Sequence, residues 1–141
     1  MKPSNREVIW VQGAISEEGK SYFQEYIEAN FGWERLMCGL DIKMKSIYHI
    51  IRNRPYMTTN IFTFNIGKDN KNMEDINYQV LEQLKDGRFI AAKFSSKEIK
   101  ICKPNIVSVF SNDKPEVKKL ATDRWKIFNI KDNDLINVSQ K

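Results

Sequence analysis

The chain has 141 residues, a formal net charge of +5 and a sequence pI of about 9.2. Hydrophobic residues make up 41% of it and aromatic residues 11%, which is typical of a globular protein and excludes a disordered one. This length predicts a single domain with one core over residues 1–141. The excess of positive charge permits a polyanionic partner but does not require one.

Two classes of site find little support in the residue counts. The sequence has one histidine, His49, and its two cysteines, Cys38 and Cys102, lack the spacing of metal ligands. These counts argue against a zinc site and against a Ser-His-Asp triad. No apolar run is long enough to cross a bilayer, and residues 1–6 lack the apolar stretch of a signal peptide. We therefore expect an intracellular protein in which both cysteines are buried thiols.

The first elements alternate between strand and helix. Residues 8–11 form the continuous apolar run Val-Ile-Trp-Val, which is typical of a strand buried on both faces of a parallel sheet. Apolar residues on one side of a helical wheel predict a helix over 20–31. A short strand around 35–38, an amphipathic helix over 44–51 and a buried strand over 60–66 follow.

The second half continues this alternation and adds a hairpin. It contains, in order, a helix over about 73–85 closed by Asp86-Gly87, a hairpin over 88–102, a strand over 106–110, a short helix over 115–120, a strand over 125–128 and a polar, frayed tail over about 131–141. Strands and helices that alternate in this way predict a three-layer α/β domain with a mostly parallel sheet and an inserted β-hairpin.

The loop after the first strand ends in Gly19-Lys20-Ser21, like a phosphate-binding loop. The strict pattern has four residues between its glycines, whereas Gly13 and Gly19 are separated by five. The position is favourable, because backbone N–H groups at a helix start bind phosphate, a lysine there reaches the terminal phosphates and a serine binds Mg²⁺. The glutamates at 17 and 18 repel a triphosphate, so an ordinary glycine turn with a surface lysine stays open as an alternative.

Four stretches of sequence together indicate a family. They are REVIWVQG…EGKS, NIFTFNI, GRFIAAKF and the pair PNIVSVFSN and TDRWKIFNI, which lie within about residues 6–130. In this order they resemble the helicase (ATPase) domain of replication-initiator Rep proteins from circular single-stranded DNA viruses, a group of superfamily 3 helicases. Nanoviruses and their satellites are the most similar, and circoviruses are more distant. The resemblance implies a P-loop NTPase fold.

The resemblance also implies how a nucleotide is bound. The residues that would bind ATP are Gly13, Gly19, Lys20 and Ser21, with the serine as a ligand of Mg²⁺. Asn112 would position the attacking water against the terminal phosphate. Arg124 is a candidate arginine finger that reaches the nucleotide of a neighbouring subunit, and the alternative is an ion pair with a nearby acid.

The hairpin is the implied DNA-binding element. Lys93, Lys97 and Lys100 would contact the backbone of single-stranded DNA inside a ring of subunits, a hexamer by the family's pattern, although a merely solvated hairpin would carry the same charges. A viral protein of this group would act in the host nucleus. Paired histidines of a nicking domain are absent, so we expect this chain to be the motor part alone.

One position departs from the family pattern. The second motif has an aspartate that binds Mg²⁺ and polarises water, whereas this chain has Asn65, and the loss of such a group lowers a rate by about two to four orders of magnitude. Asp69 is a possible substitute. Two functions therefore stay open: an ATP-dependent DNA helicase, and a hydrolysis-deficient module that binds nucleotide or DNA and oligomerises. A small P-loop kinase is a weaker third alternative, because no arginine-rich lid is visible.

Overall fold

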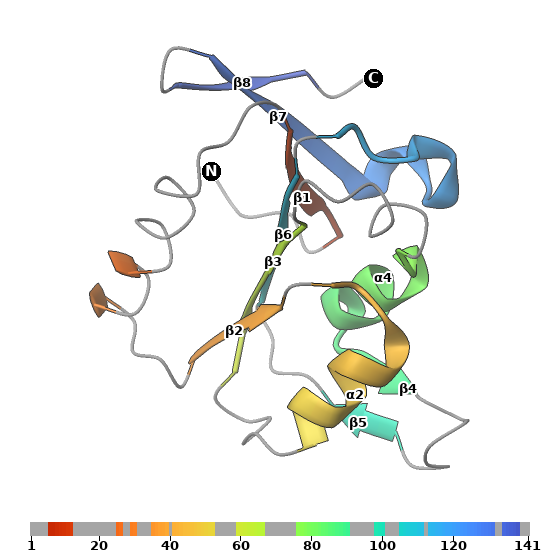
Figure 1. The fold of residues 1–141 in the computed structure, drawn as a ribbon. Helices are drawn as coiled ribbons and strands as arrows, with labels where there is room; N and C mark the ends of the chain where they lie inside the picture. The colour runs from red at the N-terminus through yellow and green to blue at the C-terminus, as the bar shows by residue number, and fades with distance from the viewer. Residues whose placement is uncertain are drawn as a thin grey trace.

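The structure is a computed structural model that describes residues 6–12, 25–26, 29–30, 35–39, 41–52, 59–66, 76–90, 98–100, 105–111, 113–131 and 134–138. Its main feature is a six-stranded sheet in the order β2-β3-β6-β1-β7-β8 (Figure 1). The strands are β1 (Val8–Gln12), β2 (Leu36–Gly39), β3 (Ile61–Asn65), β6 (Ile106–Phe110), β7 (Trp125–Lys131) and β8 (Asp134–Asn137). All neighbours pair in parallel except β7 and β8, which are antiparallel. The predicted α/β class with a mostly parallel sheet is confirmed.

Two helices cover one face of this sheet. Helices α2 (Met44–Arg52) and α4 (Tyr78–Asp86) lie on the same side in Figure 1, and the helical residues 25–26 and 29–30 lie across the sheet from them. The covered face is apolar because one row of side chains, aligned across four strands, is formed by Phe64, Val109, Trp10 and Ile127, all of them buried. These side chains and the apolar stripes of both helices form one core cluster.

A separate two-stranded sheet follows α4. Strands β4 (Arg88–Ile90) and β5 (Glu98–Lys100) pair antiparallel, which confirms the predicted hairpin. Phe89 is fully buried in the main core while Arg88 and Ile90 are exposed, so the hairpin is attached to the domain along one face. The segment between β6 and β7 contains two 3₁₀ turns, η2 (Val117–Lys119) and η3 (Thr122–Arg124).

Three aromatic rings fix the start of α4 and this segment against the sheet. Trp10 and Tyr78 are stacked with ring centroids 6.2 Å apart, and Trp125 meets both rings edge-on at 6.0 Å. The polar atoms of all three find partners, because Trp10 donates to the carbonyl of Asp113, Trp125 donates to that of Val117, and the Tyr78 hydroxyl accepts from the amide of Glu116. Trp10 and Trp125 therefore belong to the core of the domain.

Four sequence-based expectations differ from the structure. Residues 134–137 form strand β8 rather than part of a frayed tail, because they pair with β7. Helix α4 begins at Tyr78 and not near 73, since Ile76 and Asn77 are not helical. The helix expected over 115–120 is the shorter turn η2. Cys38 is exposed on β2, contrary to the expected buried thiol, and Cys102 lies outside the described residues. Among the described helices, none is long and apolar enough to span a bilayer.

Candidate functional site

The carboxyl edge of the parallel strands is the place where this topology positions a ligand. The chain leaves β1 for β2 at the far side of the sheet and returns through β3 and β6, and it then passes β1 to form β7 on the other side. The two directions of travel diverge at β1, which makes its carboxyl end a topological switch point. Ligands of open α/β sheets bind in the crevice outside such a point.

The end of β1 is held in place from both sides. The amide of Ser111 donates to the carbonyl of Val11 at 2.9 Å, which extends the pairing with β6 beyond Phe110. On the other side, the Gln12 side chain donates through Nε2 to Oδ1 of Asn129 on β7 at 2.7 Å. Gln12, the residue that precedes the predicted phosphate-binding residues in the sequence, therefore has a fixed position at the switch point.

Asn65 ends β3 at the same edge. It is aligned with Phe110 of β6, which is aligned in turn with Val11 of β1, and the amide of Ile66 continues the ladder by donating to the Phe110 carbonyl at 2.9 Å. The backbone position is thus well defined. Its side-chain oxygen Oδ1 is buried and accepts no hydrogen bond from the described part of the chain. A buried acceptor without a partner is costly, so binding of a hydrogen-bond donor or a cation at this oxygen would be favourable.

Behind Asn65, on the same face of the sheet, lies a pair of buried hydroxyl groups. Thr63 and Ser108 are aligned in the β3–β6 register, and their hydroxyl oxygens are 3.2 Å apart. Ser108 also donates to the carbonyl of Phe62 at 3.5 Å. The sequence analysis missed this pair, although two hydroxyl residues inside apolar strands signal a partner across the sheet. The hydroxyl pair connects β3 to β6 two residues before Asn65 along the strand.

The described chain includes few of the predicted site residues. Gly13, Gly19, Lys20, Ser21, Lys93, Lys97 and Asn112 lie outside the described residues, as does Asp69. Lys100 is placed by its backbone alone, at the end of β5 and opposite Arg88 in the hairpin register. Of the predicted catalytic residues, Asn65 and Arg124 are described, and they lie at different places in the fold.

Arg124 is held inside its own chain. Its side chain is 6% exposed, and its two terminal nitrogens donate to the two carboxylate oxygens of Asp86 at 2.8 and 2.9 Å. Its Nε lies 3.7 Å from Glu82, and Nη1 also donates to the backbone carbonyl of Arg6. The hydrogen bonds with Asp86 raise the pKa of Arg124 above its usual value, against the opposing effect of burial.

This geometry bears on the predicted role of Arg124. A buried guanidinium in a two-point contact with a carboxylate matches the ion-pair alternative stated above. To act as an arginine finger, Arg124 would have to break its two hydrogen bonds with Asp86. The partner was overlooked in the sequence, although Asp86 gave a signal: an acid in the last turn of a helix is unfavourable toward the helix dipole unless a cation compensates it.

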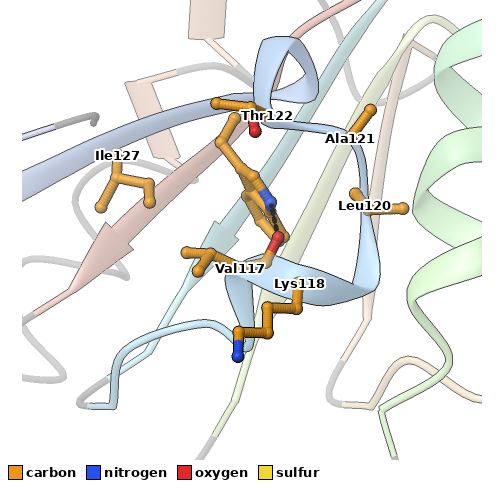
Figure 2. A pocket seen from close by; sticks show the side chains of 7 residues that line it. Val117, Lys118, Leu120, Ala121, Thr122 and Ile127 are labelled. Atoms are coloured by element: carbon orange, nitrogen blue, oxygen red, sulfur yellow. Dashed lines mark hydrogen bonds between the residues drawn. The ribbon is translucent and has the colours of Figure 1, made fainter. Parts of the chain in front are cut away.

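The structure also contains a pocket away from this edge. It has a volume of about 440 Å³ and is lined by Val117, Lys118, Leu120, Ala121, Thr122, Trp125 and Ile127 (Figure 2). Trp125 is aligned with Val8 at the amino end of β1, so the pocket lies at the opposite end of the strands from Asn65. Its lining is mostly apolar, and it contains none of the predicted site residues. Sequence patterns gave no sign of it.

Groups of three or more histidine, cysteine, aspartate or glutamate residues that would hold a metal are absent from the described part of the chain. Asn65 offers a neutral amide oxygen at the position where the resemblance stated above implies a carboxylate. Amide oxygens do bind hard cations, but Mg²⁺ in proteins is held mainly by carboxylates and by the phosphates of its substrate.

Comparisons with known proteins give the relatives of this chain. It is 35% identical over 126 residues to Para-Rep C3 of Milk vetch dwarf C3 alphasatellite, which is 89% of this chain and 42% of the relative. Para-Rep C6 of Subterranean clover stunt C6 alphasatellite is 32% identical over 127 residues, and Para-Rep C7 of Faba bean necrotic yellows C7 alphasatellite is 32% identical over 135 residues.

The matched region covers about nine tenths of this chain, and it spans 42–43% of the length of these relatives. No protein-family model and no solved structure matches it. The resemblance to Rep proteins that was inferred from the motifs is confirmed: over about nine tenths of its length, the chain is similar to the Para-Rep proteins of alphasatellites.

Proposed function

We propose that the chain is the ATP-dependent motor domain of a Rep-type replication initiator, with a P-loop NTPase fold, and that it acts on single-stranded DNA. The observation that carries this proposal is the position of the Gly19-Lys20-Ser21 sequence. It follows β1, the strand at the switch point of the sheet, where a parallel α/β topology binds its ligand. Kinship with Para-Rep proteins supports the same function.

The proposed cofactors are ATP and Mg²⁺. Gly13, Gly19 and Lys20 would hold the phosphates, and Ser21 with the Oδ1 atom of Asn65 would hold the metal ion, which neutralises phosphate charge when bound. Asn112 follows β6, the strand next to β1, so it is suited by its place in the sequence to the edge where the phosphates would lie. The proposed DNA-binding residues are Lys93, Lys97 and Lys100 of the hairpin.

A hexameric ring around single-stranded DNA is part of this proposal and comes from the family resemblance. The ion pair of Arg124 with Asp86 counts against Arg124 as the residue that reaches into a neighbouring subunit. A ring in which another cation has that role is compatible with the geometry described above. The proposed partners are therefore single-stranded DNA and further copies of the chain.

A second candidate function is favoured by one specific observation. The buried oxygen of Asn65 lies at the end of β3, where the family resemblance implies a negatively charged residue for hydrolysis. A neutral amide leaves phosphate binding intact, or improves it, while removing the charge that polarises water. The second candidate is thus a module with the same fold that binds nucleotide and DNA but hydrolyses ATP very slowly.

Steady-state ATP hydrolysis with Mg²⁺ and single-stranded DNA separates the two. The variants are Lys20→Ala, which removes the proposed phosphate contact, and Asn65→Asp, which restores the charge. Hydrolysis by the parent chain that Lys20→Ala abolishes supports the motor. No hydrolysis by the parent but activity in Asn65→Asp, a gain of about two to four orders of magnitude, supports the binding module. Absence of both hydrolysis and nucleotide binding in every variant refutes both candidates.

A further inference from the structure

The pocket beside η2, η3 and β7 has an apolar floor that belongs to the core. Leu120, Trp125 and Ile127 line it and are 7%, 7% and 6% exposed. Its volume of about 440 Å³ lies within the range of about 300–1,000 Å³ that is typical of small-molecule sites, and it exceeds the volume of any one side chain. Val117 also lines the pocket and is 43% exposed, so the apolar surface continues from the floor out to the solvent.

The polar groups of the lining leave little for a polar ligand to bind. The indole N–H of Trp125 donates to the carbonyl of Val117 at 2.9 Å, the bond drawn as a dashed line in Figure 2. The carbonyl of Thr122 accepts from the amide of Trp125. Among the lining side chains, this leaves the hydroxyl of Thr122 and the ammonium group of Lys118. A nucleobase has donors and acceptors around its edge that are costly to bury without partners, so this lining favours a ligand body made of hydrocarbon.

Two lysines give the open side of the pocket a positive charge. Lys118 lines the pocket and Lys119 follows it; both are exposed, and neither forms an ion pair with another residue in the described part of the chain. Of the acids nearest in the sequence, Asp123 is paired with Arg6 at 2.9 Å, and Glu116 is not a lining residue. A lysine packs its stem along apolar surface and keeps its ammonium group in water. The charge at the opening therefore favours an anionic group over a cationic one.

We propose that this pocket binds an organic acid with a hydrocarbon body, the chemistry of a medium-chain fatty acid. The hydrocarbon packs against the floor, and the carboxylate lies beside Lys118. Because the volume exceeds what one side chain fills, a free acid fits better than an apolar side chain of a docked acidic peptide. The pocket lies at the amino end of β1 and β7, so this site is additional to those of the proposed function and does not depend on them.

The test titrates the isotope-labelled full chain with hexanoate, octanoate, octanol and octylammonium below their micellar concentrations. The indole N–H signal of Trp125 in an NMR spectrum reports binding, because Trp125 lines the pocket. Each methylene group that becomes buried lowers Kd by up to about fourfold, so octanoate should bind about 5- to 15-fold more tightly than hexanoate. Octanoate should also bind more tightly than octylammonium, by a ratio that shrinks as salt is added.

Variants separate the charge from the apolar floor. Lys118→Met keeps the stem and removes the ammonium group, so it should raise the Kd of octanoate about 2- to 5-fold and leave that of octanol unchanged. Lys45→Met, at an exposed position of α2, is the matched control and should change neither.

Ala121→Phe, at an exposed position of the lining, should fill the pocket and weaken octanoate and octanol alike by about 10-fold or more. If this variant does not fold, Val117→Trp serves in its place at another exposed lining position, with the same expected loss.

Four outcomes overturn the proposal. The first is a Trp125 signal that does not move with either alkanoate. The second is octylammonium that binds as tightly as octanoate, because the lysines would then not select the ligand. The third is an octanoate affinity that filling the pocket leaves unchanged, which places the binding elsewhere. The fourth is tighter binding of the blocked peptide Glu-Glu-Phe-Glu-Glu than of octanoate, which assigns the pocket to a protein partner instead.

Discussion

Two ion pairs of nearly equal length allow the contribution of burial to be measured in one protein. Asp86 pairs with Arg124 at 2.8 and 2.9 Å, and Asp123 pairs with Arg6 at 2.9 Å. The Arg124 side chain is 6% exposed, whereas those of Arg6 and Asp123 are 55% and 63% exposed. The perturbation is the same for both pairs: each aspartate is changed to asparagine, which keeps the shape and removes the charge.

The expected cost for Asp86→Asn follows from what remains around Arg124. Removing one partner from a buried pair costs about 3–5 kcal/mol, because it leaves an uncompensated charge. Two features reduce this figure: Asp86 is itself 43% exposed, and Glu82 stays 3.7 Å from Arg124. We therefore expect a loss of about 2–3 kcal/mol in the free energy of unfolding and a fall of about 5–10 °C in Tm for a domain of this size.

The matched control is Asp123→Asn. Hydrogen bonding from Arg6 lowers the pKa of Asp123, but both groups are exposed and screened by water, so we expect no measurable loss of stability. Urea unfolding followed by tryptophan fluorescence reports both changes, since Trp10 and Trp125 are buried in the core. Equal costs for the two variants, or a larger cost for Asp123→Asn, would show that burial of Arg124 does not govern the strength of its ion pair.

Two further predictions concern α4. Burial raises the pKa of Tyr78 above 10.0, so its neutral form contributes stability that is fully present below about pH 10 and is lost as pH rises through the folded-state pKa. The urea midpoint of Tyr78→Phe should therefore fall less steeply than that of the parent as the pH rises above 10. An equally steep fall would show that ionisation of Tyr78 does not cause the loss of stability. Gly87 has φ of 86°, so Gly87→Ala should lower the free energy of unfolding by about 1 kcal/mol in the same urea titration, whereas an unchanged midpoint would show that the turn relaxes without strain.

The elements with strong local patterns could be predicted from the sequence. Strand β1 begins with a continuous apolar run, and β3 and β6 are largely apolar with one buried hydroxyl residue each; the structure has all three within a residue or two of their expected places. The hairpin was recognisable from two short runs around a polar tip. These signals are local, because burial on both faces of a strand leaves a direct record in the residue types.

Features that depend on distant partners could not be predicted. Strand β8 has two apolar residues, Leu135 and Ile136, and forms because β7 supplies a free edge beside it. Cys38 is exposed because it stands on the outermost strand of the sheet, and strand order cannot be read from one residue. The partner of Arg124 lies 38 residues away in the chain, and the ion pair follows from how α4 packs against the sheet.

The two proposed activities of the candidate site depend on different features, and this difference explains why the proposal of nucleotide binding has more support than that of hydrolysis. The proposed binding of phosphates rests on two features, the place of β1 in the strand order and the glycine-containing sequence that follows it. The proposed hydrolysis also requires a negative charge, and at the position that the family resemblance assigns to it this chain has the uncharged Oδ1 of Asn65. Because the backbone of Asn65 is fixed by its pairing with β6, an aspartate introduced there would place its carboxylate where the amide now lies. Activity restored by that single change would mean that the scaffold for catalysis is complete and that the missing element is the charge alone.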